Sequence, residues 1–389
     1  MSLPGRPKGE FRSAQHEGTP VSVAPLRIAL LGPANSIHLQ RWAAALVERG
    51  HGVSVVSQHR VERALLPARA DVLWLPHQGH LGYFANVWAL RRHLSRWRPG
   101  LLNVHYASGY GTTGGLAGFR PTLLSVWGSD VYEFPYENVF KGWLVRKVLR
   151  RATAIASTSH AMAAQVRRLT PERHEVAVTP FGVDLARFAA QPSQRDPACL
   201  TLGIVKSLAT QYGVDLLLRA FAGLCADADV RAAQPTCRLL IVGDGPQRDE
   251  LLRLAAQLGI AGRTRFVGAV AHSEVPRWLH RLDVFAAPSR SESFGVAVIE
   301  AGACGLPVVV SDAGGLPEVV VDGETGLVVP RNNVPALQAA LKRLLLDPGL
   351  RERLGRQARA HVEREYAWGL CVDRMERCYV DTMARSAPV

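Results

Sequence analysis

The chain has 389 residues, of which 48% are hydrophobic and 20% are charged. This is the composition of a soluble globular protein, and it excludes a chain that is disordered throughout. At about 150 residues per domain, the length suggests two or three domains. The net charge is +13, and nearly all of the excess lies in residues 1–190, with 23 basic and 11 acidic side chains against 23 and 22 in residues 191–389. A high-GC coding sequence would also raise the total number of arginines, but it does not explain why the excess lies in one half. We therefore expect the two halves to bind different partners.

Residues 1–25 lack the apolar centre of a signal peptide, and we interpret them as a flexible leader. No run of 18 apolar residues occurs, so no transmembrane helix is expected. The six cysteines, all from Cys199 onward, have no metal-ligand spacing. A disulfide framework or a zinc site is therefore not expected, and a cytoplasmic location fits best.

The first half of the chain predicts alternating strands and helices. An aliphatic run over 27–31 ends at Gly32-Pro33, a helix with one apolar face follows over 39–49, and a strand is expected over 53–56 after Gly50. Such a strand–helix–strand unit opens an α/β domain. Further buried strands are expected at 71–75, 101–105, 122–126 and 154–157, with a turn at 181–184.

A polar linker over 189–198 separates this series from a second one of the same kind. Two parallel-sheet domains in series leave a cleft beyond the carboxyl ends of their strands, where ligands of open α/β sheets bind. The strands of the second series are expected at 200–205, 238–242, 265–267, 284–287, 307–310 and 326–329, and its helices at 214–224, 248–258, 334–345 and about 350–383.

The most informative segment is residues 289–301, which follows the strand at 284–287 and Pro288. A helix that begins near Phe294 or Gly295 would direct its free N–H groups into the cleft and, with its dipole, form a site for phosphate. Glu292 lies just before this helix, and Glu300 lies between one and two turns into it. One extended ligand with hydroxyl groups on both sides of a diphosphate, such as a nucleotide sugar, would satisfy both carboxylates and the helix.

The two acids alone could equally be a helix-start residue and a solvated helix residue. Their setting argues against this interpretation, because Glu300 is surrounded in the sequence by apolar and small residues from Ala297 to Cys304. A carboxylate buried among apolar residues needs a hydrogen-bond or ion-pair partner.

At this point the sequence resembles a known family. Glu292-Ser-Phe-Gly295 with Glu300 matches the Glu-x7-Glu motif of retaining GT-B glycosyltransferases, in particular glycosyltransferase family 4 (group 1). The resemblance covers roughly residues 27–370, with the motifs in the family's order. The other matching segments are residues 181–184, 243–246, 266–268, 303–309, 314–318 and 323–326.

The resemblance implies an α/β fold of the GT-B type, with two Rossmann-like domains facing each other across a cleft. It divides the chain into an acceptor-binding domain over 26–190 and a nucleotide-sugar-binding domain over 191–365, with a C-terminal helix over about 366–389 that packs back on the first domain. It implies that Glu300 binds the ribose and that Glu292 acts on the donor sugar. The remaining donor-binding residues that it implies are Gly32, Lys206, Gly243, Gly245, Val267, Ser293, Phe294, Gly295 and Val296.

One feature departs from the family pattern. The family has a basic pair on the donor diphosphate, and here Lys206 supplies one charge while Gln211 or Tyr212 takes the second position. Losing a donor at the leaving group could cost several kcal/mol of transition-state stabilisation. A neighbouring arginine such as Arg290 is a possible substitute.

The first half should complete the site. His105 ends a buried strand and matches the family's active-site histidine, although a core histidine with satisfied hydrogen bonds is the alternative. Trp127-Gly-Ser-Asp130 resembles the family's His-Gly-Ser-Asp segment, and Asp130 would orient a substrate hydroxyl or cap the next helix. We therefore expect His105, Lys206, Asp130 and Glu292 to be catalytic. The residues expected to bind the acceptor are Asn35, Ser36, His38, Tyr106 and Trp127.

The resemblance implies transfer of a hexose-type sugar from a UDP- or GDP-sugar to a hydroxyl group, with retention of anomeric configuration. The expected route is front-face displacement, in which the departing phosphate takes the acceptor proton. No cofactor or metal ion is expected, since helix N–H groups and Lys206 carry the positive charge. A nucleotide-sugar-binding protein without catalysis is the alternative, and a GT-B epimerase fits the motifs less well.

Two basic segments, residues 88–98 and 140–151, are amphipathic. In the second, Phe140 is expected on the apolar side with Leu144, Val145, Val148 and Leu149. Such a helix could lie on an anionic membrane, which would place the protein peripherally on the inner face of the membrane with a lipid-linked, glycan or small-molecule acceptor. The alternative is a helix that packs in the core and exposes only its charged face. No nucleic-acid motif is present, and no nucleic-acid partner is expected.

Overall fold

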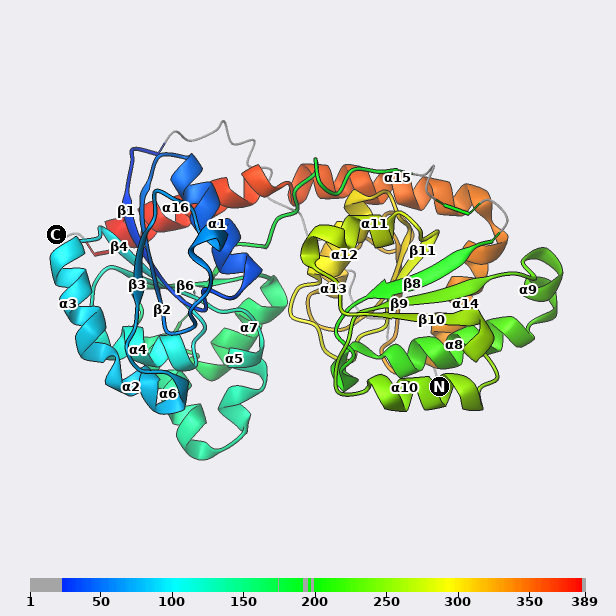
Figure 1. The fold of residues 1–389 in the computed structure, drawn as a ribbon, viewed down its shortest axis with the longest axis horizontal. Helices are drawn as coiled ribbons and strands as arrows, with labels where there is room; N and C mark the ends of the chain where they lie inside the picture. The colour runs from blue at the N-terminus through cyan, green and yellow to red at the C-terminus, as the bar shows by residue number, and fades with distance from the viewer. Residues whose placement is uncertain (1–22, 174, 192–194, 197–198, 387–389) are drawn as a thin grey trace, which may run out of the picture.

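The computed structural model describes residues 23–173, 175–191, 195, 196 and 199–386. It contains two parallel sheets, each covered by helices on both faces, and the two domains lie side by side (Figure 1). This confirms the predicted GT-B architecture. The expected leader over 1–25 lies almost entirely outside the described residues.

The first domain holds a seven-stranded sheet in the order β3-β2-β1-β4-β5-β6-β7. The sequence predicted six of these strands and missed the two-residue β7. The strands are β1 (Arg27–Leu31), β2 (Gly52–Ser57), β3 (Asp71–Trp74), β4 (Leu101–His105), β5 (Thr122–Ser125), β6 (Ala154–Ser157) and β7 (Ala177–Val178). The helices are α1 (Ile37–Glu48), α2 (Gly79–Ala85), α3 (Val87–Trp97), α4 (Gly109–Ala117), α5 (Ser129–Tyr132), α6 (Val139–Arg151) and α7 (His160–Leu169).

The second domain holds a six-stranded sheet in the order β10-β9-β8-β11-β12-β13. All six strands were predicted to within two residues at each end. They are β8 (Thr201–Val205), β9 (Arg238–Val242), β10 (Thr264–Gly268), β11 (Val284–Ala287), β12 (Val308–Ser311) and β13 (Leu327–Val329). The helices are α8 (Val214–Ala226), α9 (Ala228–Ala233), α10 (Arg248–Gln257), α11 (Val275–Leu279), α12 (Val296–Ala303), α13 (Leu316–Val319) and α14 (Val334–Leu346).

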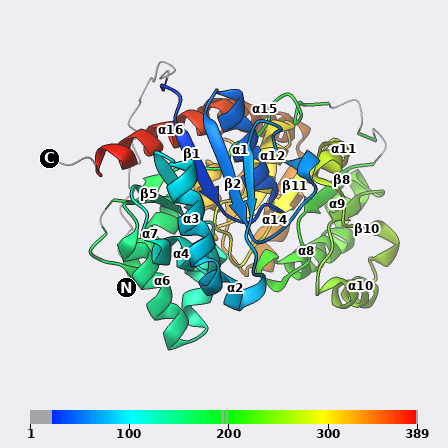
Figure 2. The same cartoon turned by 60° about the vertical axis from the view of Figure 1, so that its left-hand side comes forward.

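The predicted helix over about 350–383 is two helices, α15 (Pro348–Glu365) and α16 (Trp368–Ala384), with the break at Tyr366 and Ala367. α15 packs on the second domain, and α16 crosses to the first (Figures 1 and 2). The break coincides with a short parallel bridge between Val183 and Ala367, the two crossing points of the chain. The chain therefore passes between the domains twice at one place.

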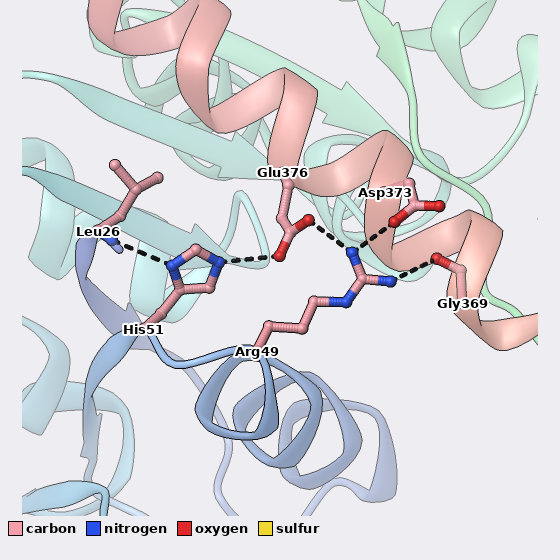
Figure 3. Close-up of polar contacts among 6 residues, drawn as sticks. All are labelled: Leu26, Arg49, His51, Gly369, Asp373 and Glu376. Atoms are coloured by element: carbon pink, nitrogen blue, oxygen red, sulfur yellow. Dashed lines mark hydrogen bonds and ion pairs between the residues drawn. The ribbon is translucent and has the colours of Figure 1, made fainter. Parts of the chain in front are cut away.

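A buried ionic cluster attaches α16 to the first domain (Figure 3). Glu376 accepts from His51 Nε2 at 2.8 Å and from Arg49 at 2.6 Å, and Arg49 also pairs with Asp373 and donates to the Gly369 carbonyl. The other ring nitrogen of His51 accepts from the Leu26 amide at 3.0 Å. Each polar group that α16 buries there has a partner, as burial of charge requires.

Helix α6 packs one face into the first domain. Leu144, Val145, Val148 and Leu149 are buried, and the last three belong to the domain's hydrophobic core. The prediction that Phe140 shares this face is wrong, because Phe140 is 60% exposed and stacks beside the half-exposed Trp143. No helix in the described part of the chain is long and apolar enough to span a bilayer.

Candidate functional site

Each sheet has a topological switch point, where the chain begins to add strands on the other side of the first strand. β1 lies between β2 and β4 in the first sheet, and β8 lies between β9 and β11 in the second. In an open α/β sheet the crevice at such a switch point, beyond the carboxyl ends of the strands, is the ligand site. The loops that leave β1, β8 and β11 carry Gly32, Lys206 and Glu292, respectively, and His105 is the last residue of β4. The strand order thus gathers residues predicted from four separate motifs.

The predicted helix after Pro288 is present as α12, with Gly295 at its N-cap. Gly295 adopts a φ of +106°, a region open mainly to glycine, and an added Cβ would lie 2.8 Å from Leu316. The chain can therefore turn from Glu292 into the helix only with glycine at this position. No side chain caps the helix, so its first N–H groups remain available to an anion.

Glu292 and Lys206 form an ion pair between the loops that follow the adjacent strands β11 and β8, with 2.7 Å between Glu292 Oε2 and Lys206 Nζ. The ammonium also lies 4.3 Å from the centre of the Tyr212 ring. Burial lowers the pKa of Lys206, but Glu292 and Tyr212 more than offset this, and the net pKa is above its usual value. Lys206 is therefore a fixed positive charge close to the start of α12.

Glu300 is buried on α12 and pairs with His272, with 2.8 Å between Oε1 and Nε2. His272 follows β10, and its Nδ1 is buried without a hydrogen-bond partner. The sequence indicated that Glu300 needs a partner but did not identify His272. One oxygen of this carboxylate pairs with His272, and a carboxylate can accept further hydrogen bonds from ligand hydroxyl groups.

The second basic charge is absent from the place where the family pattern has it. Gln211 uses its carbonyl to accept from the Arg290 and Ser291 amides, and the Tyr212 ring lies beside Lys206. Arg290 does not substitute, because its guanidinium forms a bidentate pair with Asp215 at 2.8 and 2.7 Å. Arg41 on α1 is a cation that the sequence analysis missed: its guanidinium stacks on Trp368 at 4.0 Å, and its Nη2 is buried without a partner.

His105 is fully buried, and neither of its ring nitrogens has a hydrogen-bond partner. Burial, with a small contribution from His38, lowers the pKa of His105 to about 3, so the ring is neutral near pH 7. A core histidine with satisfied bonds, the alternative considered from the sequence, is not what the structure shows. A neutral imidazole with unused nitrogens can hydrogen-bond a ligand but does not act as a cationic acid.

An aromatic cluster adjoins His105 and contains three of the residues predicted to bind the acceptor. The Trp127 ring lies 5.1 Å from His105, 4.8 Å from Tyr106 and 5.6 Å from His38. His38 stacks on Phe181 at 4.1 Å, and burial followed by the charge of Arg41 lowers its pKa to about 4. Trp127 thus contacts both His105 and Tyr106.

Asp130 has a structural environment that does not fit a catalytic role. Its two oxygens accept from the backbone amides of Ala107 at 2.7 Å, Gly128 at 2.8 Å and Trp127 at 3.1 Å. It is almost completely buried, and burial raises its pKa despite these bonds. Asp130 therefore joins the loops after β4 and β5, and we assign it a positioning role in place of the predicted catalytic one.

Several predicted donor residues also have local structural roles. Ser293 donates to the Trp127 carbonyl at 3.3 Å and accepts from Ser159 at 2.7 Å through its own carbonyl, so it joins the two domains. Gly243 and Gly245 allow the loop after β9 to pack on the loop after β8, since an added Cβ would meet carbonyl oxygens there at 1.9 and 2.5 Å. Phe294 is buried beside Tyr366 and Phe181, Val296 is the first residue of α12, and Val267 lies partly buried in β10.

A pocket of about 420 Å³ opens in the first domain and is lined in part by Tyr106. It contains the predicted acceptor residues Asn35, Ser36 and Tyr106. His59, Tyr83 and Tyr110 also line it, and the sequence analysis did not single them out. No pattern in one sequence could have marked them, because they lie after β2, on α2 and on α4.

Two parallel-sheet domains with these loops at their facing edges define the GT-B class of fold, and comparisons with known proteins agree. Residues 190–361 match the family described as glycosyl transferases group 1, and residues 27–159 match glycosyl transferase 4-like. The glycogen synthase of Mycobacterium tuberculosis H37Rv is 34% identical over 234 residues, 59% of this chain and 54% of that protein.

A GDP-mannose-dependent α-(1-6)-phosphatidylinositol monomannoside mannosyltransferase of Mycolicibacterium smegmatis is 31% identical over 275 residues. The match covers 65% of this chain and 68% of that enzyme, whereas the chain spans about half the length of the glycogen synthase. The sucrose-phosphate synthase structure from Thermosynechococcus elongatus superposes with a TM-score of 0.79 at 23% identity, over 93% of this chain and 100% of the other. Anabaena Alr3699/HepE in complex with UDP and glucose superposes with a TM-score of 0.76 at 19% identity, over 92% and 100%.

The chain belongs to the group 1 glycosyltransferases of the GT-B fold.

Proposed function

We propose that the protein transfers a hexose-type sugar from a UDP- or GDP-sugar to a hydroxyl acceptor, with retention of anomeric configuration. The observation that carries this proposal is the pairing of Glu292 with Lys206 at the uncapped start of α12, with Glu300 further along the same helix. Glu292 suits the hydroxyl groups of a sugar, Lys206 and the free N–H groups suit a diphosphate, and Glu300 suits the hydroxyl groups of a ribose.

The proposed reaction breaks the bond between the anomeric carbon and the diphosphate oxygen and forms one to the acceptor oxygen on the same face. The bonding electrons leave with the phosphate, whose new negative charge Lys206 and the α12 N–H groups stabilise. The acceptor proton moves to that phosphate oxygen, so no protein base is needed. Because these groups supply the positive charge, we propose that the reaction is independent of metal ions.

Two relatives have names that specify a glucan product or a GDP-mannose donor, which supports a hexosyl donor here. A thermal-shift series with UDP-, GDP- and ADP-sugars identifies the nucleotide. Turnover of the stabilising donor, followed by NMR of the product's anomeric proton, then tests retention. Inversion, or loss of activity in chelator, would contradict the mechanism.

The second candidate is a nucleotide-sugar-binding protein without catalysis. The observation that favours it is the missing second basic residue, with Arg290 diverted to Asp215. The two functions differ in one result, because the non-catalytic protein would be stabilised by a nucleotide sugar yet would release no nucleotide with any acceptor.

We also propose a peripheral location on an anionic cytoplasmic membrane surface, with a lipid-linked or glycan acceptor. Leu81 is 82% exposed, Trp88 76% and Val139 90%. They lie on α2, α3 and α6, and Figures 1 and 2 place α2 and α6 at the same end of the first domain. Lys147 lies 4.5 Å from the exposed Trp143 ring. Aromatic side chains with adjacent cations are typical of a membrane interface.

Vesicle flotation tests this location. Wild-type protein should float with phosphatidylglycerol vesicles and not with phosphatidylcholine vesicles. The double variant Val139→Ser, Trp143→Ser should lose most of this binding, and Leu252→Ser, which removes an exposed leucine of the second domain, should keep it. Equal binding by all three proteins would contradict the proposal.

A further inference from the structure

The pocket beside Tyr106 has a chemistry that is unusual for so basic a domain. Among the described residues that line it, none carries a charge at neutral pH, because burial lowers the pKa of its histidine, His59. The lining consists of hydroxyl, amide, imidazole and aromatic groups, from Asn35, Ser36, His59, Tyr83, Tyr106 and Tyr110. Such a lining stacks on the faces of a sugar ring and exchanges hydrogen bonds with its hydroxyl groups.

A hydrogen-bond network behind the pocket holds the side chains of His59 and Tyr110 in place. Ser57 Oγ accepts from the amides of Ala34 and His59, both at 3.1 Å, donates to the His59 carbonyl at 3.3 Å, and lies 2.9 Å from Tyr110 Oη. Tyr110 Oη also accepts from the Gln58 amide at 3.1 Å. Tyr110 Oη also lies 2.7 Å from His59 Nδ1, and the two atoms share a hydrogen bond.

The network therefore engages Nδ1 of His59 and fixes the ring, and Nε2 is the ring nitrogen that this network does not use. Nε2 can exchange a hydrogen bond with a ligand hydroxyl in a fixed direction. Tyr83 is held against the pocket as well, because an added Cβ at Gly109 would lie 2.3 Å from its ring and its carbonyl accepts from Thr113 at 2.7 Å. Tyr106 has a φ of +75°, a strained conformation that persists only where the surroundings enforce it.

The pocket is also correctly placed for an acceptor. Tyr106 contacts Trp127, and Trp127 also contacts His105. A ring bound against Tyr106 would therefore lie one aromatic side chain away from the group predicted to lie at the donor sugar. No arginine or lysine is among the described residues that line the pocket, so the lining offers no cation to a phosphate group.

We infer that this pocket binds an uncharged sugar ring of the acceptor, and that His59, held by its hydrogen bond to Tyr110, positions it. The inference rests on the proposed glycosyl transfer and specifies its acceptor. It excludes an acceptor that is phosphorylated on the ring that receives the new bond.

Saturation-transfer NMR with methyl hexosides and the corresponding methyl hexoside 6-phosphates tests the inference, in the presence of UDP. Neutral hexosides should receive saturation, and their 6-phosphates should receive at least about tenfold less. His59→Gln should weaken hexoside binding about tenfold, the effect of one hydrogen bond to a buried group. His80→Gln, at an exposed histidine of α2 outside the pocket, is the matched control and should bind normally.

Asn35→Ala provides a second variant that leaves the network intact, since Asn35 is exposed at the pocket. It should weaken hexoside binding about fivefold. The inference is overturned if the 6-phosphates bind as well as the neutral sugars, if neither binds, or if His59→Gln matches the control. UDP binding in the same samples reports on the proposed function separately, because the nucleotide site lies in the other domain.

Discussion

Replacing Lys206 with methionine tests the central contact of the site, because it removes the ammonium while keeping most of the side chain's volume. The ion pair with Glu292 spans 2.7 Å, and the two side chains are only 21% and 10% exposed. Loss of one partner from a fully buried pair costs about 3–5 kcal/mol. Since both groups retain some contact with solvent, we expect the free energy of unfolding to fall by about 2–3 kcal/mol.

The effect on nucleotide binding follows from the same charge. A phosphate oxygen about 4 Å from the ammonium gains about 4 kcal/mol at an effective dielectric constant of 20. If desolvation cancels about half of this gain, about 2 kcal/mol remains, and UDP should bind Lys206→Met about 30-fold more weakly than wild type. Uridine, which has no phosphate, should bind both proteins equally.

Urea denaturation and calorimetric titration with UDP and uridine measure these quantities. The double variant Lys206→Met, Glu292→Gln removes both charges, so it should regain stability but not UDP affinity. Arg290→Met is the matched control, because its pair with Asp215 does not face the predicted diphosphate site. Equal losses of UDP and uridine affinity, or a loss in Arg290→Met as large as in Lys206→Met, would refute the reasoning.

Three further predictions concern other parts of the site. Glu300→Gln should weaken UDP and uridine alike by about 10- to 100-fold in calorimetry, since its contact is with the ribose, and unchanged uridine binding would contradict this. Burial lowers the pKa values of His105 and His38 to about 3 and about 4 in the folded protein, from 6.5 when unfolded. The contribution of these neutral rings to the free energy of unfolding is complete above pH 6.5. It is lost as the pH falls towards 4, at up to about 1.4 kcal/mol per pH unit for each ring. In urea denaturation between pH 7 and 5, the free energy of unfolding of His105→Gln should therefore fall less steeply than that of the wild type. Glu318 of the second domain accepts from the His160 and Ala161 amides at the start of α7 in the first, at 2.7 and 2.6 Å. Glu318→Gln should therefore cost about 1 kcal/mol of domain contact and raise the radius of gyration in small-angle scattering, whereas an unchanged radius would show that other contacts keep the domains together.

The sequence by itself determined the class of fold and the positions of its elements. Alternating aliphatic runs and helical periods report local burial, so β1, β4, β6, β9 and β11 match their predicted bounds. The glycine at 295 and the acids at 292 and 300 also could be interpreted without a structure. Their roles depend on how one short segment turns into a helix, which is a local property of the chain.

Only the tertiary structure decided which groups those residues meet. Lys206 and His272 lie on other loops and pair with Glu292 and Glu300, respectively. Arg290 pairs with Asp215 and is not free to bind the diphosphate. Asp130 accepts hydrogen bonds from backbone amides of two loops. The pocket beside Tyr106 likewise joins side chains from several separate elements. Partners of this kind depend on the order of strands in the sheet and on the closure of two domains, and sequence spacing carries no record of either.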